Sequence, residues 1–218
     1  MQPIPMFDLR NAGPAAHAAK NPRSVKRLRD ACLRPAPGWA LGLLRPVDAV
    51  ERRWIARTGS PYGRDIAEIE ASLGLAGVVA INMSYQYGCT TGVAPGRTGA
   101  PRMRRVLDWP FDGLGEAVEI HHLSGPAGDY FSVGWPGAVG VLTGMAPGRF
   151  CAAINQAPMR RRLRPAAARP LDIAMNLANT LLRETGWPPD HLLRHAFENC
   201  ATFEAAMALL VRIGRAHV

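Results

Sequence analysis

Three residues in the middle of the chain have the types that a cysteine nucleophile and its partners need, at a spacing that a hairpin can close. Cys89 stands between small residues, Arg105 follows it by 16 positions and Asp108 follows it by 19. A guanidinium close to a thiol favours the reactive thiolate, because an opposite charge stabilises the charged form. A single cysteine at the start of a strand is more often structural, so the interpretation depends on whether the chain brings these residues together.

A hairpin across these positions can return Arg105 and Asp108 to the side of Cys89. Strands are predicted over 89–94 and 103–108, with a glycine-rich turn between them. Along a strand, Arg105 and Asp108 point to opposite faces unless a bulge or the end of the strand intervenes. The spacing alone therefore leaves the position of Asp108 open.

Short apolar runs separated by turn signals continue to about residue 155, as in an antiparallel meander. Further strands are predicted over 117–123, 129–134, 139–143 and 149–154. Helical patterns flank this block, over 14–34, 46–57, 65–75, 171–184, 190–197 and 202–213. The segment 77–85 is strand or helix, because periodicity cannot decide for a short apolar run. The order of the elements predicts an α+β fold, with an antiparallel sheet and flanking helices.

The spacing of the three residues also gives the chain a resemblance to a known group of enzymes. Cys89–Thr90–Thr91, with Arg105 and Asp108 behind it, resembles the start of the mature subunit in N-terminal-nucleophile hydrolases. The similar members are of the acid ceramidase and N-acylethanolamine acid amidase type, which are relatives of choloylglycine hydrolase and penicillin V acylase.

Further segments follow the same order as in that family. A helix with the signature Glu68–Ile69–Glu70 and then an apolar segment come before the cysteine. A Thr143–Gly144 turn and a strand follow, and Asn155 then stands beside the polar Gln156. The resemblance covers about residues 60–210 and implies that 77–85 is helical.

The family likeness implies a partial αββα sandwich and a chain that cuts itself between Gly88 and Cys89. Residues 1–88 would then be a helical, pro-like segment, and residues 89–218 the hydrolase core. The backbone N–H of Asn155 would donate a hydrogen bond to the oxyanion, a contribution worth about 100–1,000-fold in other enzymes. The implied catalytic residues are Cys89, Arg105, Asp108 and Asn155.

The implied mechanism begins with the amine that cleavage creates on Cys89. An α-amine has a usual pKa of about 7.7–8.0, so it is a base attached to its own nucleophile, and Asp108 would orient it. Attack of the thiolate on an amide carbonyl gives a tetrahedral oxyanion and then a thioester acyl-enzyme, which water hydrolyses. The expected activity is hydrolysis of linear amide C–N bonds in small N-acyl substrates with an apolar acyl chain, without a cofactor or a metal.

Family members usually continue beyond the position where this chain stops, with further strands and a second asparagine of the oxyanion hole. The resemblance thus implies a core that is incomplete at its C-terminus, with a complementing chain or a homo-oligomer as possible partners. Gln156 replaces an acidic residue that acid ceramidase relatives have after the asparagine. Three alternatives stay open: acyl transfer to an amine, an inactive truncated homologue, and a basic binding protein.

The charge of the chain admits an anionic partner but does not specify one. The net charge is +9, and the only lysines among the 26 basic residues are Lys20 and Lys26. An arginine-, alanine- and proline-rich composition is typical of a high-GC bacterial genome. The densest basic run, 160–164, has no interleaved aromatic residue on which bases could stack, so nucleic acid is not the expected partner.

Cysteine and histidine spacing predicts no metal site. The four cysteines lie far apart without a CxxC pair. His121 and His122 are adjacent and so face opposite sides of a strand, whereas His191 and His195 have helical spacing but no third ligand in view. There is no apolar run of about 18 residues and no signal-peptide pattern at the start, so we expect a cytoplasmic protein without a membrane span.

Overall fold

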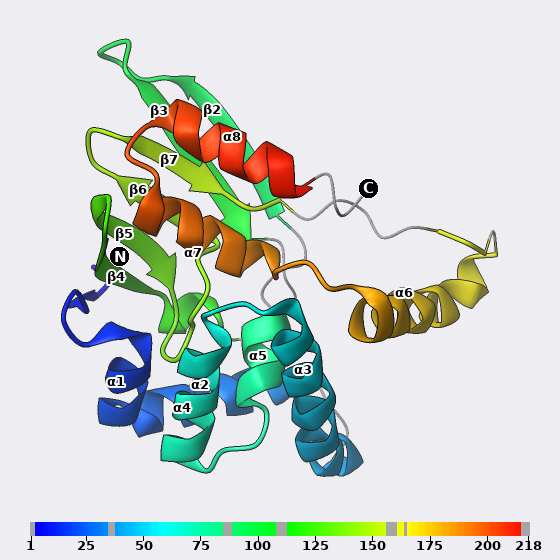
Figure 1. The fold of residues 1–218 in the computed structure, drawn as a ribbon. Helices are drawn as coiled ribbons and strands as arrows, with labels where there is room; N and C mark the ends of the chain where they lie inside the picture. Colours follow the sequence, from blue (N-terminus) through cyan, green and yellow to red (C-terminus); the bar gives the residue numbers. More distant parts are fainter. Residues whose placement is uncertain are drawn as a thin grey trace.

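The computed structural model describes residues 3–34, 38–84, 89–107, 113–155, 161–163 and 165–214. Helices fill the N-terminal part, strands the middle and helices again the C-terminal part (Figure 1). The α-helices are α1 (Gly13–Lys20), α2 (Pro22–Leu33), α3 (Leu44–Thr58), α4 (Gly63–Leu73), α5 (Val78–Ser84), α6 (Arg169–Arg183), α7 (Pro189–Asn199) and α8 (Phe203–Gly214). The molecule is thus a mixed α/β protein, and the predicted order of its elements is confirmed.

The strands form a five-stranded sheet and a separate hairpin. The sheet has the order β1-β4-β5-β6-β7, and the hairpin consists of β2 and β3. Their bounds are β1 (Met6–Asp8), β2 (Cys89–Pro95), β3 (Pro101–Leu107), β4 (Glu119–Gly125), β5 (Gly128–Gly134), β6 (Thr143–Ala146) and β7 (Phe150–Ala153). The prediction of a purely antiparallel sheet is wrong at one edge, because β1 pairs with β4 in parallel. Three residues carry too little alternation to mark β1 in the sequence.

The strand predicted over 139–143 is also wrong, since β6 begins only at Thr143. The apolar residues before Thr143 are buried in the core, but they do not pair with a neighbouring strand. Val139 N–H donates to Asn82 Oδ1 (2.9 Å), and Val141 N–H donates to the carbonyl of Asp190 (3.1 Å). These two backbone N–H groups therefore find their acceptors on helices α5 and α7 and not on a neighbouring strand.

The helical segment before the hairpin is built largely as predicted. The expected helix 14–34 is divided in two at Asn21, where Pro22 begins α2. The ambiguous run 77–85 contains a helix, α5, as the family resemblance implies. Buried Asp48 accepts hydrogen bonds from Gly77 N–H (2.6 Å) and Ala80 N–H (3.0 Å). This carboxylate satisfies donors in the first turn of α5 that have no partner within the helix.

One face of the sheet is covered by α7 and α8 (Figure 1). Phe197 of α7 is fully buried and stacks between Tyr130 of β5 and Phe150 of β7, with ring centroids 5.5 and 4.9 Å apart. The opposite face is more open, since Met145 of β6 is 51% exposed. The main core of the sheet thus lies on its α7 side.

A second set of contacts attaches the N-terminal segment to the sheet. Leu9 N–H, directly after β1, donates to the carbonyl of His122 (2.8 Å). His17 of α1 lies beside Glu119 and His121 of β4. Burial works against the ionisation of Glu119, but the hydrogen bonds from His121 and His17 hold its pKa below the usual value. Glu119 is therefore an ionised carboxylate inside the protein.

Truncation of the stacked ring should test the importance of the core beside α7. We expect Phe197→Ala to lower the free energy of unfolding by about 3–5 kcal/mol, because it leaves a cavity between Tyr130 and Phe150. Phe203→Ala is the matched control, since Phe203 is 54% exposed and should cost about 0.5 kcal/mol or less. Urea unfolding measures both, and equal losses would contradict this description of the core.

The stability of the helical segment should fall as the pH rises, because of Glu51 on α3. Burial first, and then the negative charge of Asp48, raise the pKa of Glu51 from 4.5 to about 8. Between these values the folded protein keeps a proton that the unfolded chain has lost, so raising the pH favours unfolding. Glu51→Gln should therefore gain stability relative to the natural chain by about 3–4 kcal/mol between pH 5 and pH 8. Parallel stability curves for the two proteins would exclude this origin.

Candidate active site

The hairpin places Cys89 and Arg105 on the same face. Its register pairs Cys89 with Leu107 and Thr91 with Arg105, so that Arg105 is a diagonal neighbour of Cys89. The turn closes where Gly96 N–H donates to the carbonyl of Ala100 (2.7 Å). The predicted hairpin is confirmed, and its alternation turns Arg104 to the opposite, exposed face.

The guanidinium of Arg105 contacts the sulfur of Cys89 and two further parts of the fold. Its Nη2 lies 2.5 Å from Cys89 Sγ and 3.0 Å from the carbonyl oxygen of Ile154, which follows β7. Its Nη1 donates to Thr143 Oγ1 at the start of β6 (2.7 Å). Bonds to Thr143 and to Ile154 thus hold the guanidinium in place, and Nη2 of this planar group points at the thiol.

Cys89 differs from the other three cysteines in its surroundings. Its side chain is half-buried, whereas Cys32 and Cys200 are buried and Cys151 is exposed. Burial raises the pKa of Cys32 to about 11 and also raises that of Cys200, which makes both thiols poor nucleophiles at neutral pH. Among the described cysteines, Cys89 has a sulfur that accepts a hydrogen bond from a guanidinium, and this contact distinguishes it from the other three.

Asn155 lies close to the same face of the hairpin. Its Oδ1 accepts a hydrogen bond from Thr91 Oγ1 (2.8 Å), and Thr91 is two residues after Cys89 on β2. The neighbouring Ile154 is held by Arg105. Cys89, Arg105 and Asn155 are therefore brought together, whereas the predicted residues Asp108 and Gly88 lie outside the described part of the chain.

No local sequence pattern marks the groups that hold Arg105. Thr143 belongs to the family resemblance, which implies no role for it, and a backbone carbonyl such as that of Ile154 has no side-chain signal. Both become partners only because β6 and β7 lie next to the hairpin (Figure 1). Long-range pairing of this kind is not visible in local spacing.

The two histidines with helical spacing on α7 do not face one site. His191 Nδ1 lies 2.8 Å from Ser60 Oγ, and His195 Nδ1 lies 3.1 Å from Asn199 Nδ2. Burial, together with the positive charge of Arg194, lowers the pKa of His191 to about 3, so that it is neutral at physiological pH. These contacts give each histidine a separate structural role.

Arginines also gather on the outer face of the hairpin. An open groove of about 350 Å³ follows it and is lined by Arg97, Arg102 and Arg104 among other residues. Arg104 pairs with Gly92, on the face opposite to that of Arg105 and Thr91. The groove is therefore separate from the cysteine and carries no assignment of its own.

No protein family and no curated protein matches the chain. Among the described residues, none of the helices combines the length and the apolar content that crossing a bilayer requires. A function for the chain is therefore inferred from the geometry around Cys89.

Replacement of Arg105 should loosen the hairpin. Arg105→Gln removes the charge-assisted bond to Thr143 and the bond to Ile154, which together are worth about 1–3 kcal/mol. Amide hydrogens of β2 and β3 should then exchange at least about tenfold faster with solvent. Arg104→Gln removes the same charge from the exposed face and should leave the exchange rates unchanged. Equal effects of the two substitutions would show that Arg105 does not anchor the hairpin.

Proposed function

We propose that this chain is an amidohydrolase of the N-terminal-nucleophile type, with Cys89 as its nucleophile. It would cut itself between Gly88 and Cys89 and then hydrolyse linear amides of N-acyl substrates with an apolar acyl chain. The observation that carries the proposal is the 2.5 Å contact between Arg105 Nη2 and Cys89 Sγ. A fixed positive charge at this distance stabilises the negative charge of a thiolate.

The position of Cys89 at the first residue of β2 supports the proposed self-cleavage between Gly88 and Cys89. A nucleophile at the start of a strand can become a chain terminus without a break in the hairpin ladder. Its new α-amine then accepts the thiol proton, while the sulfur attacks the amide carbonyl carbon. The amine returns that proton to the leaving nitrogen, and water hydrolyses the thioester to release the acid.

Asn155 and Asp108 have supporting roles in this proposal. The backbone N–H of Asn155 would donate to the oxyanion, and the hydrogen bond between Thr91 and the Asn155 side chain holds this residue beside the hairpin. Asp108, which follows Leu107 in the sequence, would orient the new amine of Cys89.

The αββα sandwich is likewise part of the proposal. A sheet whose inner face is covered by α7 and α8 supplies one helix layer and one sheet layer. The hairpin with Cys89 lies next to β7 and β6 through Arg105. This arrangement is compatible with one half of such a sandwich and supports the family likeness of the sequence.

The intact mass of the purified protein tests self-cleavage directly. We expect two fragments, residues 1–88 and 89–218, under denaturing conditions. They should remain together under native conditions, because β1 pairs with β4 and His17 contacts Glu119 across the cut. Cys89→Ala should leave the chain whole, because it removes the nucleophile.

Cys151→Ala is the control, since Cys151 is exposed and lies outside the proposed site; this variant should cut itself like the natural chain. A natural chain that stays whole and whose Cys89 does not react with iodoacetamide would contradict the proposal. If fragments form, hydrolysis of N-acyl amino acids, N-acylethanolamines and penicillin V should identify the acyl and amine groups. Transfer of the acyl group to an added amine would identify the acyltransferase alternative.

A further inference from the structure

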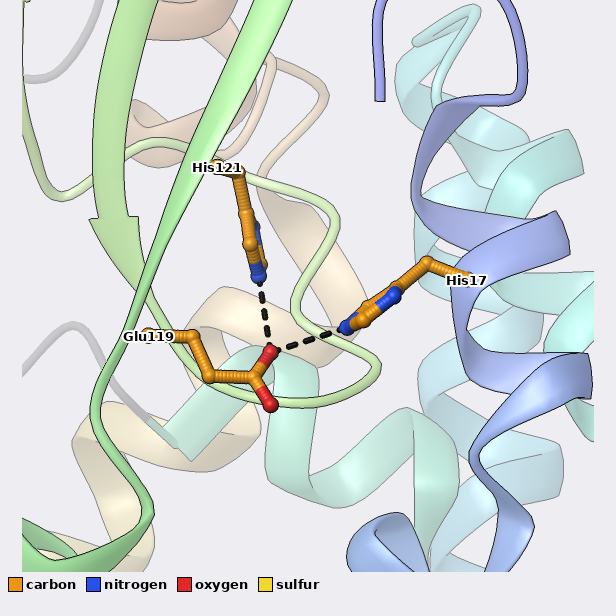
Figure 2. A group of neighbouring side chains, drawn as sticks. All are labelled: His17, Glu119 and His121. Carbon is orange, nitrogen blue, oxygen red and sulfur yellow. Dashed lines mark hydrogen bonds and ion pairs between the residues drawn. The ribbon is translucent and has the colours of Figure 1, made fainter. Parts of the chain in front are cut away.

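Two histidines and a glutamate meet at the joint between the N-terminal helices and the sheet. His17 Nε2 lies 2.9 Å and His121 Nε2 lies 3.1 Å from the same oxygen, Glu119 Oε2. Figure 2 shows both imidazole rings pointing their Nε2 edges at this carboxylate. The three ligand atoms all lie within 4.8 Å of one another, and all three residues are buried.

The fold builds this convergence from two separate elements. Glu119 and His121 are two residues apart on β4 and so share one face of the strand, while His122 points to the other face. His17 comes from α1, whose start is fixed when Gly13 N–H donates to the carbonyl of Leu9 (2.8 Å). Leu9 is in turn bonded to β4, so the distance between helix and strand is set independently of the three side chains.

We infer that His17, Glu119 and His121 form a binding site for a divalent transition-metal ion of the Zn²⁺ type, which fastens α1 to β4. Imidazole nitrogen and carboxylate oxygen are ligands of Zn²⁺, and two histidines with one glutamate are a known three-ligand set. This inference does not depend on the proposed function, because none of the three residues contacts Cys89 or Arg105 in the bonds described above.

The two distances to Glu119 fit a metal after a small adjustment, and the two Nε2 atoms, which lie within 4.8 Å of each other, have to approach to a similar separation. Ligand bonds of about 2.0–2.2 Å to a tetrahedral Zn²⁺ place two donor atoms about 3.3 Å apart. The two contacts to Glu119 Oε2 are 2.9 and 3.1 Å, so each nitrogen has to move away by a few tenths of an ångström. Rotation of the side chains is sufficient for a movement of this size.

Metal binding also fixes where the ring protons must lie. The ion needs the lone pair of each Nε2, so a ligating ring carries its proton on Nδ1. Asn21 lies next to Nδ1 of His17, and its side-chain amide nitrogen is 3.2 Å from that atom. The same nitrogen donates to the carbonyl oxygen of His17 (2.9 Å). Rotation of the amide exchanges that bond for one from Nδ1–H to the amide oxygen, which is the support that ligating histidines have from outer-shell partners.

The alternation on β4 was the one sign of this site in the sequence. Glu119 and His121 share a face, but the third ligand comes from more than a hundred residues earlier in the chain. Spacing within a single segment therefore cannot reveal the group.

Zinc binding by the full-length protein tests the inference. After EDTA has removed any bound metal and Zn²⁺ has been added back, the natural chain should retain one Zn²⁺ per chain through dialysis, and its melting temperature should rise. Glu119→Gln keeps the shape of the side chain but removes the ionised ligand, so both effects should be lost. Asn21→Ala changes no ligand, and its Kd for Zn²⁺ should rise by about 10–100-fold.

Two controls separate this site from other metal ligands. His122→Gln alters the neighbouring residue on the opposite face and should bind zinc like the natural chain. Cys89→Ala should also retain zinc, and the Co²⁺-substituted protein should lack thiolate-to-metal charge-transfer absorption. A natural chain that retains no zinc, unchanged binding in both Glu119→Gln and Asn21→Ala, or a loss confined to Cys89→Ala would overturn the inference. If Glu119→Gln does not fold, the Kd of Asn21→Ala alone decides between the outcomes.

Discussion

The guanidinium of Arg105 is the contact on which the arrangement of the candidate site depends. It extends from the hairpin to the sulfur of Cys89, to the hydroxyl of Thr143 and to the carbonyl of Ile154. A lysine could carry the same charge, but it has one ammonium group in place of a planar group with five donors. Among the described strands, no ladder pairs the hairpin with the sheet, so this side chain links Cys89 to β6 and β7.

The helical segment before the hairpin belongs to the same structure in spite of its separate position in the sequence. β1 extends the sheet beside β4, and His17 of α1 meets Glu119 inside the protein. Asp48 holds the start of α5, the last helix before Cys89. A cut between Gly88 and Cys89 would therefore separate two fragments that remain joined by a strand pair and a buried cluster of charged and polar groups.

The sequence predicts the elements of this fold better than their partners. The turn between β2 and β3 is marked by its glycines, and the helices by their periodic apolar residues, so both are found from local patterns. β1 is too short to show a pattern, and the apolar run before Thr143 is buried without a strand. At the site, Cys89 and Arg105 are near in sequence and are predicted as neighbours, whereas the Thr143 hydroxyl and the His17 ring arrive from distant segments. Contacts of that kind follow from tertiary packing, which local spacing does not encode.

The most direct test of the account is the rate at which Cys89 is alkylated at neutral pH, followed by mass spectrometry of the peptide that contains it. If Arg105 stabilises the thiolate, Arg105→Gln should slow the reaction of Cys89 with iodoacetamide by about tenfold or more. Arg104→Gln removes an equal charge from the other face of the hairpin and should leave the rate nearly unchanged. Equal rates in the natural chain and in Arg105→Gln would contradict the central claim that this guanidinium makes Cys89 a nucleophile.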